Sequence, residues 1–355
     1  MNKIYFFIGT KAQAIKCLPL METLSEFDDC NIIFVNSGQH KSIVSDVMSK
    51  STFSYREIKL YKNKDDITKY VQAFVWLFSF TFLHLIKKNN KIDPHSNNLC
   101  VIHGDTLSTL MGGIWAKRNS IKLVHLESGL TSNRLLIPFP EEIVRRIVAK
   151  ISNVLISFDK DSFNRLSIKY RKKSICYISE NTIIETLGNN LNFDNTNTVT
   201  VTLHRTENLF SKRNFQKFVD LLNSIPEKYK ITWYLHEPTE NFLNRYKPNL
   251  SKNITTSKLL GHDDFIEKIK KSSFVITDGG SIQEECYYLG KNTIIWRNTT
   301  ERPFALNKNM LISNYSVTKS QKFLLKYIDT NYKPKETVKP SEEIIKYFRN
   351  NNILK

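Results

Sequence analysis

Three carboxylates follow apolar, strand-like segments in the first half of the chain. Asp105 follows the apolar run in VIHGDT, Glu127 follows the run in VHLESG, and Glu141 lies behind the proline-containing loop in IPFPEE. Carboxylates that share a cleft can acquire different pKa values and then act as acid and base. One such acid is more simply explained as a helix cap or as compensation of a helix dipole, but three in succession favour a function.

A glycine turn near the N-terminus could bind phosphate. The turn Gly9–Lys11 follows the first apolar run and opens a helical segment that contains Lys16. Such a turn presents free amides and the positive end of the helix dipole to an anion. The segment contains neither a GxGxxG pattern nor a P-loop, so taken alone it is better explained as an ordinary strand-to-helix turn with surface lysines.

The second half of the chain has a basic pair directly after a strand-like run. VTLHRTEN places His204 and Arg205 there; a histidine can exchange a proton near neutral pH, and an arginine can pair with phosphate. The alternative explanation is a helix N-cap at Thr206. Arg302, in TTERP after a later run, could contribute further anion contacts.

A second glycine turn, in FVITDGGSIQEE, follows another strand-like run. Asp278, Gly279, Gly280 and Ser281 lie between that run and a helical segment. Glycines at this place let backbone amides approach a diphosphate. Glu285 lies one turn into the helix, where an acid can accept hydrogen bonds from ribose hydroxyls.

The elements that must position these residues alternate regularly. Short apolar or β-branched runs recur, each followed by a longer segment of helical period. The runs are IYFFIG, NIIFVN, NLCVIHG, KLVHLES, VLISF, ICYIS, TVTVTLH, ITWYLHE, FVITDGG, NTIIWR and NMLIS. Continuous apolar runs are typical of parallel strands that helices cover on both faces. We therefore expect an α/β fold, with ligands at the carboxyl ends of the strands.

The length of 355 residues favours two domains. We expect a first Rossmann-like domain at residues 1–170, a second at residues 171–332, and a linker with a C-terminal helix at residues 333–355 that could pack back on the first domain. In that arrangement the cleft between the domains is the expected site.

The charge balance is strongly basic, with 52 Lys and Arg against 34 Asp and Glu, a net charge of +18. Nucleic acid, an anionic membrane surface and a polyanionic substrate are possible partners. The alternative is a drift in composition that places basic residues on solvent-exposed faces without any partner. Nucleic acid is poorly supported because no basic patch interleaved with aromatic residues occurs. A hydrophobic content of 41% excludes disorder for most of the chain.

The remaining segments predict neither a membrane span nor a metal site. The apolar stretch 71–86 is shorter than the roughly 20 residues of a span, so we expect a buried or subunit-packing helix, with an interfacial membrane helix as the alternative. The five cysteines show no CxxC pattern and are expected to be reduced, mostly buried thiols. The histidines show no HExxH or other metal-ligand spacing.

Taken together, these motifs resemble the non-hydrolysing UDP-N-acetylglucosamine 2-epimerases of bacterial surface-polysaccharide synthesis. The matching pieces are GTKAQAIK, VIHGDT, HLESGL, PFPEEIVRRI, LHRTEN, TDGGSIQEE and TTERP. The resemblance implies two Rossmann-like domains in the glycosyltransferase-B arrangement with an interdomain cleft. It also implies a UDP-sugar substrate, a cytoplasmic homodimer that pairs through first-domain helices, and neither metal nor nucleotide cofactor.

The reaction that the resemblance implies has two halves. The C2 proton and UDP are lost to give a glycal, and UDP then adds back while C2 is protonated on its opposite face. The residues that match the family are the catalytic acids Asp105, Glu127 and Glu141, the diphosphate-side histidine His204, the basic residues Lys16 and Arg145, and the ribose-binding acid Glu285. Lys11, Arg205 and Arg302 are further expected diphosphate contacts.

Three departures from the family pattern leave a second function open. Lys11 and Gln13 stand where the family usually has Arg and Glu, Thr131 replaces a cationic residue, and the usual DSGG is here DGGS. An exchange of Arg for Lys replaces a bidentate fork with a point charge. The three acids favour a 2-epimerase, whereas the lost cations and the basic surface favour a glycosyltransferase of the same fold that acts near a membrane-borne or anionic acceptor.

Overall fold

The computed structural model describes residues 1–60, 75–76, 97–131, 139–188, 196–209, 211–302, 306, 309–330, 332–335 and 338–354. The chain forms two compact units, which are described separately. The first comprises Met1–Thr186 together with Val338–Lys355, and the second comprises Leu187–Thr337.

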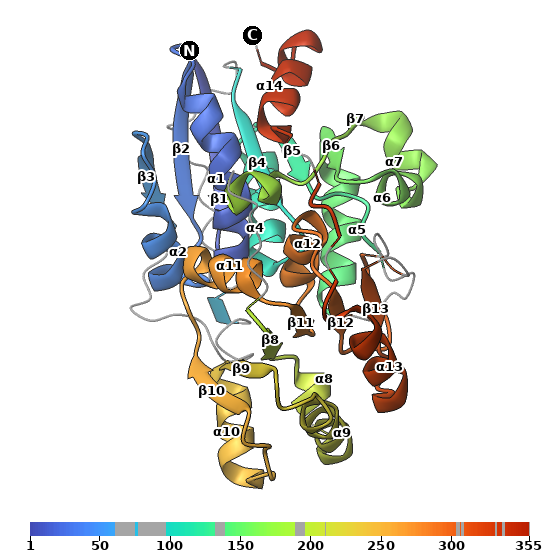
Figure 1. The fold of residues 1–355 in the computed structure, drawn as a ribbon. Helices are drawn as coiled ribbons and strands as arrows, with labels where there is room; N and C mark the ends of the chain where they lie inside the picture. Colours follow the sequence, from blue (N-terminus) through green and yellow to red (C-terminus); the bar gives the residue numbers. More distant parts are fainter. Residues whose placement is uncertain are drawn as a thin grey trace. The chain divides into compact units, whose positions relative to one another are not determined.

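The first unit contains a parallel sheet in the order β3-β2-β1-β4-β5-β6-β7 (Figure 1). Its strands are β1 (Asn2–Ile8), β2 (Cys30–Asn36), β3 (Arg56–Lys59), β4 (Leu99–His103), β5 (Lys122–Leu126), β6 (Val154–Ser157) and β7 (Ile175–Ile178). Every residue of β4 and β6 is buried, as expected where helices cover both faces of a parallel sheet. The predicted α/β class is confirmed for this unit.

Helices connect these strands and supply the other layers of the first unit. They are α1 (Lys11–Ser25), α2 (Lys41–Met48), α4 (Leu107–Arg118), α5 (Glu141–Ile151), α6 (Lys160–Arg165), α7 (Ile168–Lys173), the 3₁₀ helix η1 (Thr182–Leu187) and α14 (Pro340–Asn350). Helix α1 starts where Thr10 accepts a hydrogen bond from the backbone N–H of Gln13, and α4 starts in the same way at Thr106 and Thr109. These caps satisfy amides that the first turn of a helix leaves free.

The first unit continues beyond residue 170, where the sequence had suggested a boundary. The run ICYIS was assigned to the second domain, but it forms β7, which pairs in parallel with β6. The backbone hydrogen bonds of an edge strand decide its sheet, and an apolar run alone does not say which sheet it joins.

Helix α14 returns to the first unit from the end of the chain and packs on α1. Ile344 and Phe348 are fully buried in the core that β1 and α1 share. Tyr347 stacks on Tyr177 of β7 with ring centroids 4.1 Å apart, and its hydroxyl donates to the backbone oxygen of Cys176 at 3.1 Å. The C-terminal segment is therefore part of the hydrophobic core of the first unit.

The second unit has a parallel sheet in the order β10-β9-β8-β11-β12-β13. Its strands are β8 (Thr198–Leu203), β9 (Lys230–Leu235), β10 (Ile254–Lys258), β11 (Phe274–Thr277), β12 (Thr293–Ile295) and β13 (Met310–Ile312). Its helices are α8 (Thr206–Leu209), α9 (Lys212–Asn223), α10 (Glu237–Tyr246), α11 (His262–Lys271), α12 (Gly280–Tyr288) and α13 (Val317–Tyr327). Phe218 of α9 packs edge-on against Trp233 and Trp296, at centroid distances of 5.3 and 5.4 Å.

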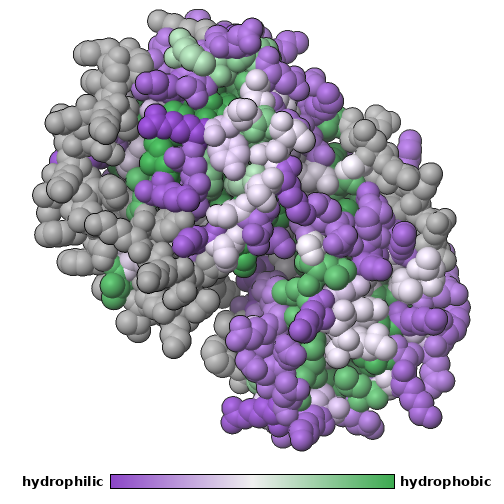
Figure 2. All heavy atoms as spheres, turned by 90° about the vertical axis from the view of Figure 1, so that its left-hand side faces the viewer, coloured by the Kyte–Doolittle hydropathy of each residue, from purple (hydrophilic) through white to green (hydrophobic). Residues whose placement is uncertain are grey.

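Most of the apolar stretch 71–86 lies outside the described residues. Of its two described residues, Trp76 donates its indole N–H to the backbone oxygen of Ser37 at 3.2 Å. Among the described helices, none is long and apolar enough to cross a bilayer. On the face drawn in Figure 2, hydrophilic residues cover most of the described surface and hydrophobic residues form smaller groups.

The core position of α14 predicts that the C-terminus stabilises the first unit. Phe348→Ala should lower its free energy of unfolding by about 3–5 kcal/mol, because a buried aromatic side chain is replaced by a cavity. Lys346→Ala, at an exposed position of the same helix, is the control and should change it by less than about 0.5 kcal/mol. Urea unfolding monitored by amide exchange in β1 and β4 measures the stability of both variants. If Phe348→Ala is as stable as the wild type, α14 does not stabilise this core.

Candidate active site

Asp105 is held by an arginine at the carboxyl end of β4. It lies in the turn between β4 and α4, and Arg145 of α5 places Nη2 2.6 Å and Nε 2.8 Å from its Oδ2. The Asp105 side chain is 23% exposed, whereas that of Arg145 is 8% exposed. The carboxylate therefore keeps access to solvent while its position is fixed by a mostly buried cation.

Glu127 follows β5 and forms a buried ion pair with Lys16 of α1. The Lys16 Nζ lies 2.7 Å from Glu127 Oε1, and both side chains are less than a tenth exposed. Glu127 adopts a φ of 63°, a left-handed conformation that is uncommon for a residue other than glycine and costs of order 1 kcal/mol or more. A buried, paired carboxylate on strained backbone is typical of a functional site.

The sheet brings these two acids to one edge. Strands β4 and β5 are neighbours in parallel register, with His103 opposite Leu126. The turns that carry Asp105 and Glu127 therefore leave the same edge of the sheet, where ligands bind in open α/β folds. His103, at the end of β4, places Nδ1 3.8 Å from Glu127 Oε2.

The third predicted acid, Glu141, is the first residue of α5 and is half-buried. The next residue, Glu142, contacts the arginine that holds Asp105: its Oε2 lies 3.2 Å from Nη1 of Arg145, and its Oε1 accepts a hydrogen bond from the Thr131 hydroxyl at 2.6 Å. Sequence reasoning missed Glu142, although its i,i+3 spacing to Arg145 was a usable signal. Thr131, which replaces a cation of the family pattern, thus bonds to an acid.

In the second unit Asp278 organises the turn after β8. Its carboxylate accepts hydrogen bonds from the backbone N–H groups of His204 and Arg205 and from the side-chain amide of Asn208 at 2.7 Å. The His204 Nδ1 lies 2.9 Å from Oδ1. Burial alone would raise the pKa of Asp278, but these hydrogen bonds and the charge of His204 lower it to about 2.

Three arginines surround one buried carboxylate, Glu301. Its oxygens lie 3.1 Å from Arg297, 3.3 Å from Arg302 and 3.7 Å from Arg205. Burial would raise the pKa of Glu301, but the three guanidinium groups hold it at about 2. Arg302 also contacts Glu284 at 3.1 Å. Sequence reasoning identified Arg205 and Arg302 but missed Glu301 and Arg297, which β12 and the following loop bring to them.

The N-terminus of α12 lies against these groups. A side chain at Gly280 would place Cβ 2.7 Å from Arg302 Nη1, and one at Gly279 would place it 3.2 Å from the His204 ring. Glycines at these positions leave room for the side chains of His204 and Arg302 beside the helix start, and Ser281 follows them in the first turn. Backbone amides, a helix dipole and guanidinium groups together suit a phosphate.

The two remaining predicted residues lie on helices. Glu285 of α12 is buried, and its Oε1 lies 3.0 Å from Nε2 of His262, which fixes the direction of the carboxylate. Lys11 is the first residue of α1 and is half-buried. Within the described ranges, no three His, Cys, Asp or Glu side chains come together as metal ligands would.

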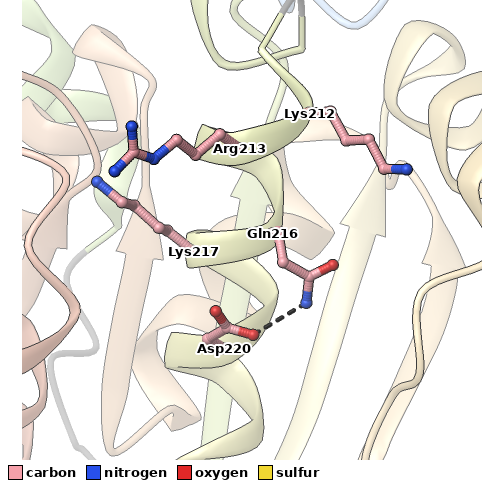
Figure 3. A pocket seen from close by; sticks show the side chains of 5 residues that line it. All are labelled: Lys212, Arg213, Gln216, Lys217 and Asp220. Carbon is pink, nitrogen blue, oxygen red and sulfur yellow. Dashed lines mark hydrogen bonds between the residues drawn. The ribbon is translucent and has the colours of Figure 1, made fainter.

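A separate surface hollow of about 540 Å³ lies on α9. Its lining side chains are Lys212, Arg213, Gln216, Lys217 and Asp220 (Figure 3). Arg213 and Lys217 point to one side of the helix and Lys212 to the other, while Gln216 donates to Asp220 at 2.9 Å. None of the predicted site residues lines this hollow, so it is a basic helix face and not part of the candidate site.

Comparison with known proteins identifies relatives over most of the chain. The family model described as UDP-N-acetylglucosamine 2-epimerase matches residues 22–352. The UDP-N-acetylglucosamine 2-epimerase of Campylobacter jejuni is 27% identical over 340 residues, which cover 88% of this chain and 85% of that protein.

Solved structures share the fold. The UDP-GlcNAc 2-epimerase from Neisseria meningitidis bound to UDP-GlcNAc matches with a TM-score of 0.78 at 22% identity, covering 99% of this chain and 100% of that one. Phytolacca americana UGT2, complexed with UDP-2fluoro-glucose and pterostilbene, matches with a TM-score of 0.58 at 8% identity and covers 98% and 99%. The predicted glycosyltransferase-B fold class is confirmed by these matches.

The Lys16–Glu127 pair predicts that removing the lysine alone lowers the free energy of unfolding more than replacing both residues. Lys16→Met should destabilise the first unit by about 3–5 kcal/mol, because it leaves the Glu127 charge buried without this cation. Adding Glu127→Gln should recover a large part of that loss, since the buried charge is then gone. Urea unfolding of both variants checks this, and a double variant no more stable than Lys16→Met would contradict the account.

The low pKa values of Asp278 and Glu301 predict acid sensitivity of the second unit. Both values are about 2 in the folded chain, below their ordinary values near 4, so each ionised carboxylate stabilises the fold above about pH 4. That stability should be lost as the pH falls from 4 towards 2. Asp278→Asn should show a shallower dependence of its unfolding free energy on pH over this window; an unchanged slope would show that Asp278 does not titrate with folding.

Proposed function

The chain belongs to the UDP-N-acetylglucosamine 2-epimerase family, and we propose that it interconverts UDP-N-acetylglucosamine and UDP-N-acetylmannosamine. The observation that carries the proposal is the pair of cation-bound carboxylates, Asp105 and Glu127, at the carboxyl ends of adjacent strands. Inversion at C2 needs one group to remove a proton and another to deliver one to the opposite face. Two carboxylates in different environments meet that need.

In the first half of the proposed reaction a carboxylate removes the C2 proton. The electron pair of the C2–H bond forms the C1–C2 double bond while the bond from C1 to the diphosphate oxygen breaks. In the second half UDP adds back to C1, and an acid protonates C2 from the other face. Asp105, Glu127 and Glu141 are the acids proposed for these steps, and Lys16 and Arg145 hold two of them in place.

The second unit is proposed to bind the nucleotide. Departure of UDP leaves negative charge on the diphosphate, which Arg205, Arg302 and the amides of Gly279–Ser281 could stabilise. His204 has its Nδ1 beside Asp278 and a partly exposed ring, so it is placed to contact the same phosphates. Glu285, whose carboxylate contacts His262, is the proposed acceptor for the ribose hydroxyls.

A glycosyltransferase of the same fold is the second candidate. The similarity in fold to UGT2 and the replacement of a family cation by Thr131 favour it. Such an enzyme transfers the sugar to an acceptor and does not need to exchange the C2 proton. The two functions therefore predict opposite results when no acceptor is present.

The cellular setting is part of the same proposal. The activated N-acetylmannosamine would supply surface-polysaccharide synthesis, with the enzyme in the cytoplasm as a homodimer that pairs through first-unit helices. The basic exposed face of α9 is compatible with peripheral contact to the inner face of a membrane.

Proton exchange at C2 tests the proposed activity. The purified protein is incubated with UDP-N-acetylglucosamine in heavy water without an acceptor, and C2 is followed by NMR. Deuterium at C2 together with new UDP-N-acetylmannosamine is the expected result. Bound UDP with no exchange would favour the glycosyltransferase.

Asp105→Asn tests the proposed role of this acid. The variant should abolish C2 exchange and leave UDP affinity nearly unchanged, because Asp105 belongs to the first unit and the proposed nucleotide contacts belong to the second. Asp46→Asn, at an exposed position of α2, is the matched control and should exchange at the wild-type rate. Exchange retained in Asp105→Asn would remove Asp105 from the catalytic group.

A further inference from the structure

Gln13 occupies the first turn of α1 and uses the oxygen of its side-chain amide to cap that helix. Its Oε1 accepts hydrogen bonds from the backbone N–H groups of Gly9 at 2.9 Å and Thr10 at 3.2 Å. Thr10 in turn accepts a bond from the Gln13 backbone N–H, which completes a capping box. An acceptor is sufficient for this half of the network, so a carboxylate could replace the amide here.

The nitrogen of the same amide reaches across to the turn that carries Asp105. Nε2 lies 2.8 Å from the backbone oxygen of His103, 3.0 Å from Thr106 Oγ1 and 2.9 Å from Thr109 Oγ1. His103 and Thr106 are the residues on either side of the turn Gly104–Asp105. Gln13 therefore holds both ends of the turn that presents the proposed catalytic acid.

Other contacts hold the middle of this turn. The Gly104 N–H donates to the backbone oxygen of Leu126 at 3.0 Å, and the Gly104 oxygen lies 2.8 Å from Nε2 of His125. Gly104 has a φ of 69°, which glycine adopts without strain. Arg145 then fixes the Asp105 carboxylate. Only Gln13, among these groups, links the turn to α1, the helix whose Lys16 pairs with Glu127.

The contacts at position 13 in this chain match the two ends of an amide. A backbone oxygen can only accept, so the group opposite His103 must donate, whereas the groups opposite Gly9 and Thr10 donate and need an acceptor. An amide satisfies both sides in a single orientation. A carboxylate would keep the cap but face the His103 oxygen without a proton, and a methionine would lose both halves.

We propose that Gln13 is a positioning residue that sets Asp105 relative to the Lys16–Glu127 pair. The proposal rests on the proposed function, because it assigns Gln13 a role in the same reaction. Gln13 does not touch the reacting atoms; it acts through the turn Gly104–Asp105. Misplacement of a reacting group by about 1 Å can slow a reaction by roughly 100-fold, so a modest shift of this turn is sufficient to be measured.

Two variants separate the halves of the network. Gln13→Glu keeps the acceptor for Gly9 and Thr10 and should lose less stability than Gln13→Met, but it should lower kcat by about 10- to 100-fold with KM changed by less than about threefold. Its amides at 103–109 should exchange faster with solvent. Gln13→Met should show the same loss of kcat together with a lower Tm.

Ser316→Ala is the matched control for loss of a cap. Ser316 caps α13 in the second unit by accepting a bond from the Lys319 N–H, so this variant should lower Tm without changing kcat. Wild-type kcat in both Gln13 variants would overturn the proposal, as would unchanged amide exchange at 103–109. If the wild type shows no C2 exchange, the proposed function fails, and amide exchange in Gln13→Glu still decides whether Gln13 holds the turn.

Discussion

Burial of carboxylates beside cations is the constraint on which both candidate clusters depend. A buried carboxylate loses its hydration, and only a close cation or several hydrogen-bond donors offset that cost. In the first unit Lys16 pairs with the buried Glu127, and Arg145 pairs with the partly exposed Asp105. In the second unit backbone amides and His204 contact Asp278. These acids therefore keep oriented side chains where strands end.

The same pairing changes the meaning of the net charge of +18. Four of the cations expected to face a diphosphate each have an acid within 4 Å: Lys16 with Glu127, Arg145 with Asp105, Arg205 with Glu301 and Arg302 with Glu284. These groups add little to the excess of positive charge. Part of that excess lies instead on exposed helix faces such as that of α9. The overall charge is thus a property of the surface more than of the candidate site.

Gln13 shows how the hydrogen-bonding groups around a side chain can accommodate an amide in place of a carboxylate. The sequence resemblance implies a carboxylate at this position, whereas the amide of this chain accepts from the backbone N–H groups of Gly9 and Thr10 just before α1 and donates to the carbonyl oxygen of His103. The turn that holds Asp105 is thereby linked to α1, which carries Lys16. An isosteric replacement at the start of a helix can in this way affect the geometry of an acid on a neighbouring strand.

The sequence alone determined the local features. The apolar runs predicted parallel strands, and the residues directly after them, such as Asp105, Glu127 and Asp278, were recognisable because strand ends are where open α/β sheets bind ligands. Tertiary structure decided which groups meet. β7 belongs to the first sheet because it pairs with β6, and Glu142 forms an ion pair with Arg145. Glu301 lies close to three arginines. Such contacts depend on how segments that are far apart in the sequence pack together. Residue types and short-range spacing do not predict that packing.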